Sequence, residues 1–140
     1  LFDFYEALSE EQGVRLALAG EGGIQGDRLM LRRALGNLLS NAIRHTSRNG
    51  MIEVRIDQPA PGEIRLTIEN PGETIPPEHL PRLFDRFYRI DSSRRRAQEG
   101  AGLGLAITRS IVEAHGGTIA VASAQGLTRF EAVFPVITPP

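Results

Sequence analysis

Apolar residues in this chain alternate between a helical spacing and a strand spacing, and this alternation restricts the fold more than any other feature. After Asp27, which can cap a helix, they recur at helical intervals up to residue 45, and the pattern stops at the turn 47–50. Residues 52–56 and 64–68 instead alternate apolar and polar side chains, as half-buried strands do. Prolines and a glycine between these two segments favour a turn, which predicts an antiparallel hairpin. The helical set comprises Leu31, Leu35, Leu38, Leu39, Ala42 and Ile43.

Further elements are predicted on both sides of this region. Residues 1–12 form an amphipathic pattern that stops at Gly13, and a strand is expected within 14–20. A second helix is expected from about Leu103 to the Gly116-Gly117 stop, followed by strands at 118–123 and 128–134. Hairpins rather than strict βαβ alternation predict a two-layer α/β sandwich, with a mixed, mostly antiparallel sheet packed against about three helices.

Composition limits the function classes. The 140 residues suit a single domain, with a frayed end at 137–140, and a net charge of −1 gives no field that would attract nucleic acid. The absence of cysteine excludes disulfides and thiolate zinc sites. No apolar run approaches the roughly 20 residues of a membrane helix, so the chain itself is predicted to be soluble. Its ligands must therefore be inferred from local motifs.

The glycine-rich segment EGAGLGLAI runs from a predicted loop straight into a helix. Glycines let backbone N–H groups approach an anion, and a helix N-terminus adds unpaired donors and a positive dipole end. The expected ligand is a phosphate. The segment lacks the Gly-Lys-Ser/Thr ending of a Walker loop and the preceding strand of a dinucleotide fingerprint. A glycine hinge in a mobile loop is the alternative.

Polar residues interrupt the apolar pattern of the first long helix. Asn37 and Asn41 stand four residues apart and therefore share a face, which suggests a polar site. An amide oxygen suits Mg²⁺, which prefers oxygen ligands and usually keeps waters and substrate phosphates. Arg44 offers a cation for phosphate and His45 a flat ring for stacking. Alternatively, Asn41 caps backbone groups and Arg44 is solvated.

The segment IENPGETIP follows a predicted strand. Asn70 has a side-chain oxygen that suits an exocyclic amine, and Gly72 leaves room for a flat base close to the backbone. An ordinary Asn-Pro-Gly turn is the alternative.

The order of these motifs resembles the catalytic ATPase domain of sensor histidine kinases, in the superfamily of gyrase, heat-shock chaperones, histidine kinases and MutL. The matching segments are LGNLLSNAIRHT (N box), IENPGETIP (first glycine box), LFDRFYR (F box), GAGLGLAI (second glycine box) and GLTRF (last glycine/threonine box). The resemblance covers essentially residues 1–136. It implies a Bergerat-type ATP-binding fold, with residues 1–12 as the tail of a connector and 85–101 as an ATP lid.

The resemblance also implies roles for individual residues. Asn41 matches the ligand of Mg²⁺, and Asn37, Asn41 and Arg44 match the catalytic positions. The residues implied to bind the nucleotide are Asn37, Asn41, Arg44, His45, Asn70, Gly72, Ile75, Tyr88, Arg89, Gly100, Gly102, Leu103, Gly104, Leu105 and Thr128.

The first glycine box departs from the family pattern. Where the family has Asp-Asn-Gly, this chain has Asn70-Pro71-Gly72, and Glu69 falls one place too early. Asn70 still offers an acceptor for adenine, but a neutral acceptor forms a weaker hydrogen bond than a carboxylate. An Asn-Pro-Gly box resembles that of heavy-metal sensor kinases.

The function implied is that of a protein histidine kinase, which binds Mg·ATP and donates the γ-phosphoryl group to a histidine on a separate dimerisation helix domain. None of His45, His79 and His115 lies in a His-Glu/Asp helix context, so the acceptor is expected outside this chain. A response regulator would receive the phosphoryl group next. The resemblance further implies a cytoplasmic domain of a bacterial inner-membrane sensor, with a monomeric fragment, a homodimeric full-length protein and no nucleic-acid partner.

Three alternatives remain. A gyrase- or MutL-like ATPase would need a glutamate at the position of Asn37 to activate water, and an amide cannot act as a general base. A nucleotide-binding regulatory module without transfer activity would be compatible with Asn70. An anti-sigma-factor kinase is less compatible with the connector-like N-terminus and the F box.

Overall fold

The computed structural model describes residues 13, 15–19, 26–86 and 104–135. The helix predicted within 1–12 and most of the predicted lid lie outside these residues. The described elements are β1 (Arg15–Ala19), α2 (Arg28–His45), β2 (Met51–Asp57), β3 (Glu63–Pro71), the 3-10 turn η1 (Leu80–Arg82), α3 (Gly104–Ala114), β4 (Thr118–Ala124) and β5 (Leu127–Pro135).

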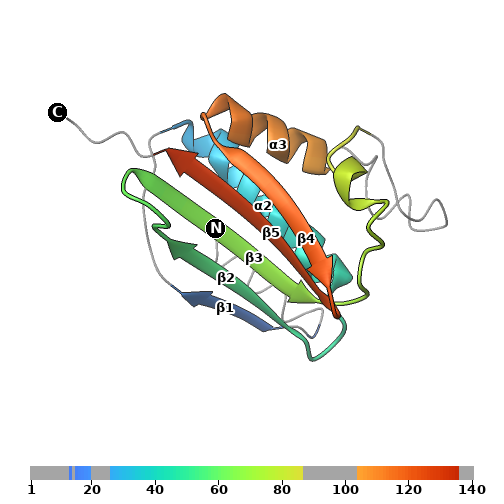
Figure 1. The fold of residues 1–140 in the computed structure, drawn as a ribbon. Helices are drawn as coiled ribbons and strands as arrows, with labels where there is room; N and C mark the ends of the chain where they lie inside the picture. Colours follow the sequence, from blue (N-terminus) through green and yellow to red (C-terminus); the bar gives the residue numbers. More distant parts are fainter. Residues whose placement is uncertain (1–12, 14, 20–25, 87–103, 136–140) are drawn as a thin grey trace.

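The strands form one sheet in the order β1-β2-β3-β5-β4. β1 runs parallel to β2, and the other neighbours are antiparallel. Helices α2 and α3 lie side by side on one face of this sheet (Figure 1). The predicted two-layer α/β sandwich with a mixed, mostly antiparallel sheet is therefore confirmed. No helix in the described ranges is both long enough and apolar enough to span a membrane.

The bounds of α2 follow from side-chain caps at both ends. The Asp27 carboxylate accepts hydrogen bonds from the backbone N–H groups of Leu29 and Met30, at 3.0 and 3.1 Å, as an N-cap residue should. At the other end the Thr46 hydroxyl donates to the Ala42 carbonyl at 2.6 Å. These caps fix where the helix stops, and so where its last turn, with Arg44 and His45, lies.

The core lies between the helices and the inner face of the sheet. It is formed by the predicted apolar residues of α2, by alternate residues of β2 and β3, and by two phenylalanines. Its main cluster comprises Leu38, Leu39, Ala42, Ile43, Ile52, Val54, Ile68, Phe84 and Phe130, and a second cluster comprises Val112, Ala132 and Phe134. Because side chains alternate along a strand, this apolar set fixes which residues of β3 face the helices.

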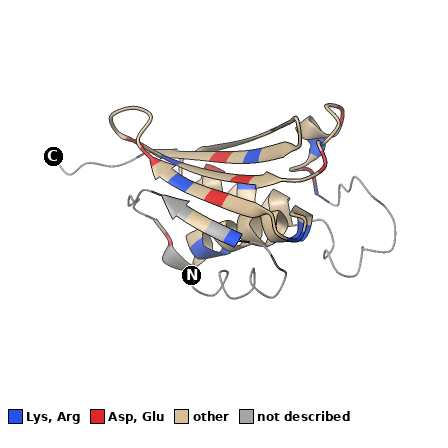
Figure 2. Cartoon of the chain, turned by 90° about the horizontal axis from the view of Figure 1, so that it is seen from below, with Lys and Arg blue, Asp and Glu red and all other residues tan. Residues whose placement is uncertain are grey.

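The outer face of the sheet carries charges of both signs (Figure 2). Arg65 on β3 reaches Asp57 on β2 at 2.6 Å and Glu131 on β5 at 3.4 Å. The hydrogen bond from the Arg65 guanidinium lowers the pKa of the Asp57 carboxyl. This polar face opposes the apolar inner face, so a one-residue shift of β3 would bury charges.

Candidate functional site

A cavity of about 440 Å³ opens where the end of α2, the end of β3 and the start of α3 meet. Most of its lining comes from segments that the sequence singled out. The lining residues are Asn41, Arg44, His45, Thr46, Ser47, Asn70, Gly72, Glu73, Ile75, Leu83, Leu105, Thr128 and Phe130. The predicted residues Asn41, Arg44, His45, Asn70, Gly72, Ile75, Leu105 and Thr128 are thus brought together around one cavity.

Register places two polar side chains at the end of an otherwise apolar row. On the inner face Ile68 of β3 pairs with Phe130 of β5, and the next inward pair is Asn70 with Thr128. Both polar residues are buried, at 3% and 6% exposure. Buried polar groups require hydrogen-bond partners, so the partners of this pair decide which polar atoms the cavity wall leaves for a ligand.

The Asn70 side chain is held in one orientation. Its amide Nδ2 donates to the Pro71 carbonyl at 3.1 Å, and a carbonyl oxygen can only accept. The opposite oxygen, Oδ1, therefore keeps its lone pairs for another donor. It accepts no hydrogen bond from the residues that the structure describes, although the side chain is almost fully buried. The cavity wall consequently presents an unused acceptor.

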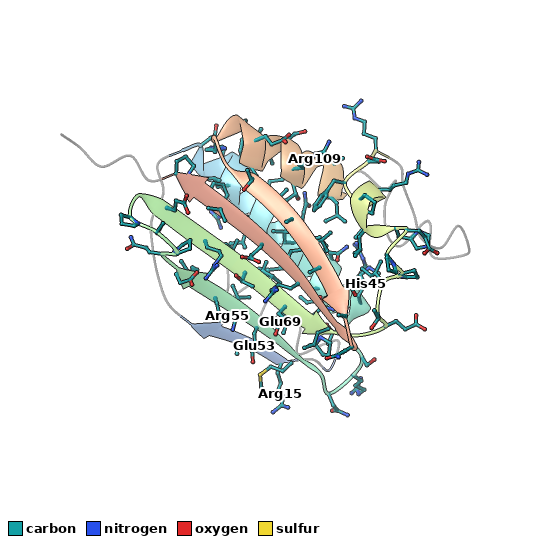
Figure 3. The ribbon with its side chains drawn as sticks, viewed as in Figure 1. Arg15, His45, Glu53, Arg55, Glu69 and Arg109 are labelled. Atoms are coloured by element: carbon teal, nitrogen blue, oxygen red, sulfur yellow. The ribbon has the colours of Figure 1, made fainter. Side chains whose placement is uncertain are left out.

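Glu69 lies on the opposite side of β3 and cannot replace Asn70. Its carboxylate reaches the Arg55 guanidinium of β2 at 3.9 Å. Figure 3 shows Arg55 and Glu69 together on the strands, away from His45 at the end of α2. The carboxylate of Glu69, which stands one residue before the position that Asn70 occupies, therefore points away from the cavity.

The last turns of α2 supply the polar groups of the second wall. Asn41 is half-buried, Arg44 is exposed, and neither side chain forms a hydrogen bond or ion pair with the described part of the chain. No cluster of three or more His, Cys, Asp or Glu side chains that could hold a metal exists in that part. The donor set fits Mg²⁺ held by one amide oxygen together with ligand phosphates and waters, and does not fit a metal held by protein alone.

Asn37 does not line the cavity. Its amide donates to the Gly104 carbonyl at 3.2 Å, and this carbonyl also accepts from the Thr108 hydroxyl at 2.8 Å. The side chain therefore ties α2 to the first turn of α3. Its predicted role in catalysis stays a prediction.

Several predicted residues lie outside the described part of the chain, namely Tyr88, Arg89, Gly100, Gly102 and Leu103. The F box is described up to Arg86. Its Phe84 packs edge-on against Phe130, with ring centroids 6.0 Å apart. Because Leu83 and Phe130 also line the cavity, this segment closes the site from the side of η1.

Sequence reasoning missed some of the wall. Thr46, Ser47, Glu73, Leu83 and Phe130 line the cavity, but each has an ordinary role in its local sequence as a cap, turn, loop or core residue. Phe130 could have been found, because it lies two residues after Thr128 and so on the same face of its strand. Thr46, Ser47 and Glu73 follow the predicted His45 and Gly72 directly in the sequence, whereas Leu83 reaches the cavity through the packing of the segment after η1.

Comparisons with known proteins agree with this geometry. The family model described as histidine kinase-, DNA gyrase B-, and HSP90-like ATPase matches residues 26–138. The sensor histidine kinase CusS of Escherichia coli O6:H1 is 57% identical over 136 residues, which cover 96% of this chain and 28% of CusS. The probable sensor kinase SilS of Salmonella typhimurium is 51% identical over 130 residues, 91% of this chain and 26% of SilS.

Among solved structures, the catalytic domain of histidine kinase ThkA superposes with a TM-score of 0.82 at 26% identity, covering 96% of this chain and 86% of that domain. The chain thus spans just over a quarter of its sequence relatives but most of a solved catalytic domain. The resemblance to sensor histidine kinases that the motifs indicated is confirmed.

Gly72 gives a test of the loop that ends β3. A Cβ added there would lie 2.7 Å from the His45 carbonyl oxygen, so Gly72→Ala must push the loop away from α2. Overpacking of this kind costs about 1–3 kcal/mol, and we expect about tenfold weaker binding of a fluorescent ATP analogue.

Gly62→Ala is the control for lost stability. Gly62 has φ +82° with open space around it, and lies in the β2–β3 turn at the other end of β3. Alanine there costs about 1–2 kcal/mol through backbone strain alone. It should lower the unfolding midpoint but leave binding unchanged. Equal binding by the two variants would refute the proposed role of the Gly72 contact.

Proposed function

Because the chain belongs to the histidine kinase-, DNA gyrase B-, and HSP90-like ATPase family, as a histidine kinase catalytic domain, we propose that its cavity binds Mg·ATP for transfer of the γ-phosphoryl group to a histidine of a separate dimerisation helix domain. The observation that carries the proposal is the unused acceptor of Asn70. It is buried at 3% exposure in a wall that Thr128 shares. The exocyclic amine of a nucleobase would donate the hydrogen bond that Asn70 Oδ1 does not receive from the described part of the chain.

The same acceptor, Asn70 Oδ1, would distinguish adenine from guanine. Adenine carries an amino group at the position where guanine carries a carbonyl oxygen. The Pro71 carbonyl engages the Asn70 amide nitrogen, which leaves Oδ1 as the side-chain atom that would meet the base. Adenine would donate to this oxygen, whereas guanine would set two acceptors against each other. The site is therefore proposed to prefer ATP over GTP.

The wall formed by α2 is proposed to receive the phosphates. Arg44 brings a positive charge, and Asn41 offers an amide oxygen to Mg²⁺ that arrives with the nucleotide. Bound there, Mg²⁺ would neutralise phosphate charge during transfer. The residues of this chain would bind the base, hold the triphosphate in line and exclude water, which is how most of the rate gain in phosphoryl transfer arises.

Hydrolysis of the gyrase or MutL type is disfavoured by Asn37. Its amide is engaged with the Gly104 carbonyl and cannot accept a proton from water. A regulatory module that binds nucleotide without transfer is the second candidate. Its support is Asn70, whose neutral oxygen makes a weaker bond to adenine than the carboxylate it replaces.

The wider context is proposed from the family. Residues 85–101 would form the ATP lid, starting beyond the anchor of Phe84 against Phe130, and residues 1–12 would join the chain to the dimerisation helices. The full-length protein would be a homodimeric inner-membrane sensor with this domain in the cytoplasm. A response regulator would receive the phosphoryl group. The Asn-Pro-Gly box, together with the high identity to CusS and SilS, supports the heavy-metal subfamily.

Asn41 tests the metal-dependent part of this proposal. Calorimetry with a non-hydrolysable ATP analogue should give binding that requires Mg²⁺. Asn41→Ala should abolish this binding, because the other ligands proposed for Mg²⁺ are phosphates and waters and the metal would lose its contact with the protein. The control is Arg33→Ala, an exposed residue on the first half of α2. Both variants should unfold at the wild-type midpoint. No detectable wild-type binding at millimolar nucleotide would overturn the function.

Asn70 and Glu69 form a matched pair, adjacent on β3 and on opposite faces. Asn70→Ala removes one hydrogen bond, worth about 1 kcal/mol, and should weaken the ATP analogue about fivefold while inorganic triphosphate binds as before. Glu69→Ala should change neither affinity, because it loses only the contact with Arg55. If Glu69→Ala weakened the ATP analogue and Asn70→Ala did not, the assignment of the base acceptor would be wrong.

Transfer itself needs a separate assay. The dimerisation domain of CusS, supplied in trans with ATP labelled at the γ-phosphate, should acquire acid-labile phosphohistidine when this chain is added. The control is the same domain with its acceptor histidine replaced by glutamine, which should stay unlabelled. Nucleotide binding without any label on either domain would favour the regulatory module.

A further inference from the structure

Ser123 lies on β4, behind the cavity wall rather than on it. Its hydroxyl oxygen accepts a hydrogen bond from the Ile75 backbone N–H at 2.8 Å and pairs with the Thr128 hydroxyl at 2.9 Å. Ile75 and Thr128 both line the cavity, whereas Ser123 does not. One hydroxyl thus joins two separate pieces of the wall.

The turn between β4 and β5 brings Ser123 to this place. Gln125 and Gly126 both have positive φ, 51° and 78°, which is the pattern of a two-residue type I′ hairpin. This turn fixes the register in which Ser123 lies opposite Thr128. The position of the hydroxyl therefore follows from the hairpin and does not depend on a bound ligand.

The same hairpin holds the loop that follows β3. The Gly72 N–H donates to the Gly126 carbonyl at 2.9 Å, and the Gly126 N–H donates to the Thr74 hydroxyl at 2.7 Å. With the bond from Ile75 to Ser123, three hydrogen bonds attach loop 72–75 to the hairpin. The two bonds at Gly126 hold Gly72 and Thr74, and the bond to Ser123 holds Ile75.

The chemistry of the hydroxyl decides what its loss would do. A backbone N–H can only donate, so alanine at position 123 leaves the half-buried N–H of Ile75 without its acceptor. Thr128 also loses the partner that restrains rotation of its hydroxyl. Both effects fall on the end of the cavity that holds Asn70, because Thr128 is the register partner of Asn70.

We propose that Ser123 is a positioning residue for the nucleobase, acting through Thr128 and Ile75 without touching the ligand. This inference rests on the proposed function, since it assigns a further determinant of base binding to the same site. Ser123 would therefore affect binding of the base alone, and the proposed phosphate-binding residues of α2 would be unaffected.

The test compares Ser123→Ala with Ser123→Thr, which keeps a hydroxyl on a strand that tolerates β-branched residues. Ser110→Ala, an exposed position on α3, is the control. Because the cavity wall at Ile75 and Thr128 is no longer held in place, we expect Ser123→Ala to bind the non-hydrolysable ATP analogue about fivefold more weakly, or about 1 kcal/mol, while inorganic triphosphate binds as to wild type. Ser123→Thr should recover wild-type affinity for the analogue.

Amide hydrogen exchange without nucleotide gives a second readout. The Ile75 amide should exchange faster in Ser123→Ala and at the wild-type rate in Ser123→Thr and Ser110→Ala. Equal loss of affinity for ATP analogue and triphosphate, or unchanged Ile75 exchange, would refute the role of Ser123. Wild-type protein that binds no ATP analogue would overturn the proposed function and this inference together, whereas wild-type affinity in Ser123→Ala would overturn this inference alone.

Discussion

The pairing of β3 with β5 is the constraint on which the rest of the site depends. It aligns Ile68 with Phe130 and then Asn70 with Thr128 on the face that the helices cover. The side-chain period of a strand is two residues, so a shift of one would turn Asn70 outward and bury Glu69 and Arg65. The salt bridges of Arg65 on the outer face and the apolar core on the inner face both oppose that shift. The forces that fold the sheet thereby also orient Asn70, the proposed base acceptor.

The helices complete the site at the same edge of the sheet. Thr46 ends α2 beside Asn70, which leaves Arg44 and His45 in the last turn at the cavity. Asn37 holds the start of α3 through the Gly104 carbonyl, so the two helices are joined at the first turn of α3. The two asparagines of α2 therefore differ in role, because Asn41 stays available to a ligand whereas Asn37 joins the helices.

Most of the fold was predictable because it depends on local patterns. The helical spacing of 31–43, the cap at Asp27 and the alternation in 52–56 and 64–68 each specify an element without reference to the rest of the chain. The motifs likewise located Asn41, Asn70 and Thr128. Contacts between distant segments were not predictable: Ser123 has no local pattern that distinguishes it from any strand serine, and the spacing of Asn37 suggested that it shares the site of Asn41. Sequence spacing shows which residues share a face, but not what packs against it.

The Asn-Pro-Gly sequence is best understood as one unit rather than as a weakened form of Asp-Asn-Gly. An aspartate at position 70 would set a second oxygen, in place of the amide nitrogen, against the Pro71 carbonyl that now accepts from it at 3.1 Å. It would also bury a charge at a position with 3% exposure, which is costly without a paired cation. Asparagine avoids both costs, lines the cavity and keeps an oxygen that no donor in the described part of the chain uses. In the proposed function, an orientation fixed before the ligand arrives would offset the weaker hydrogen bond of a neutral acceptor, because preorganisation lowers the cost of binding.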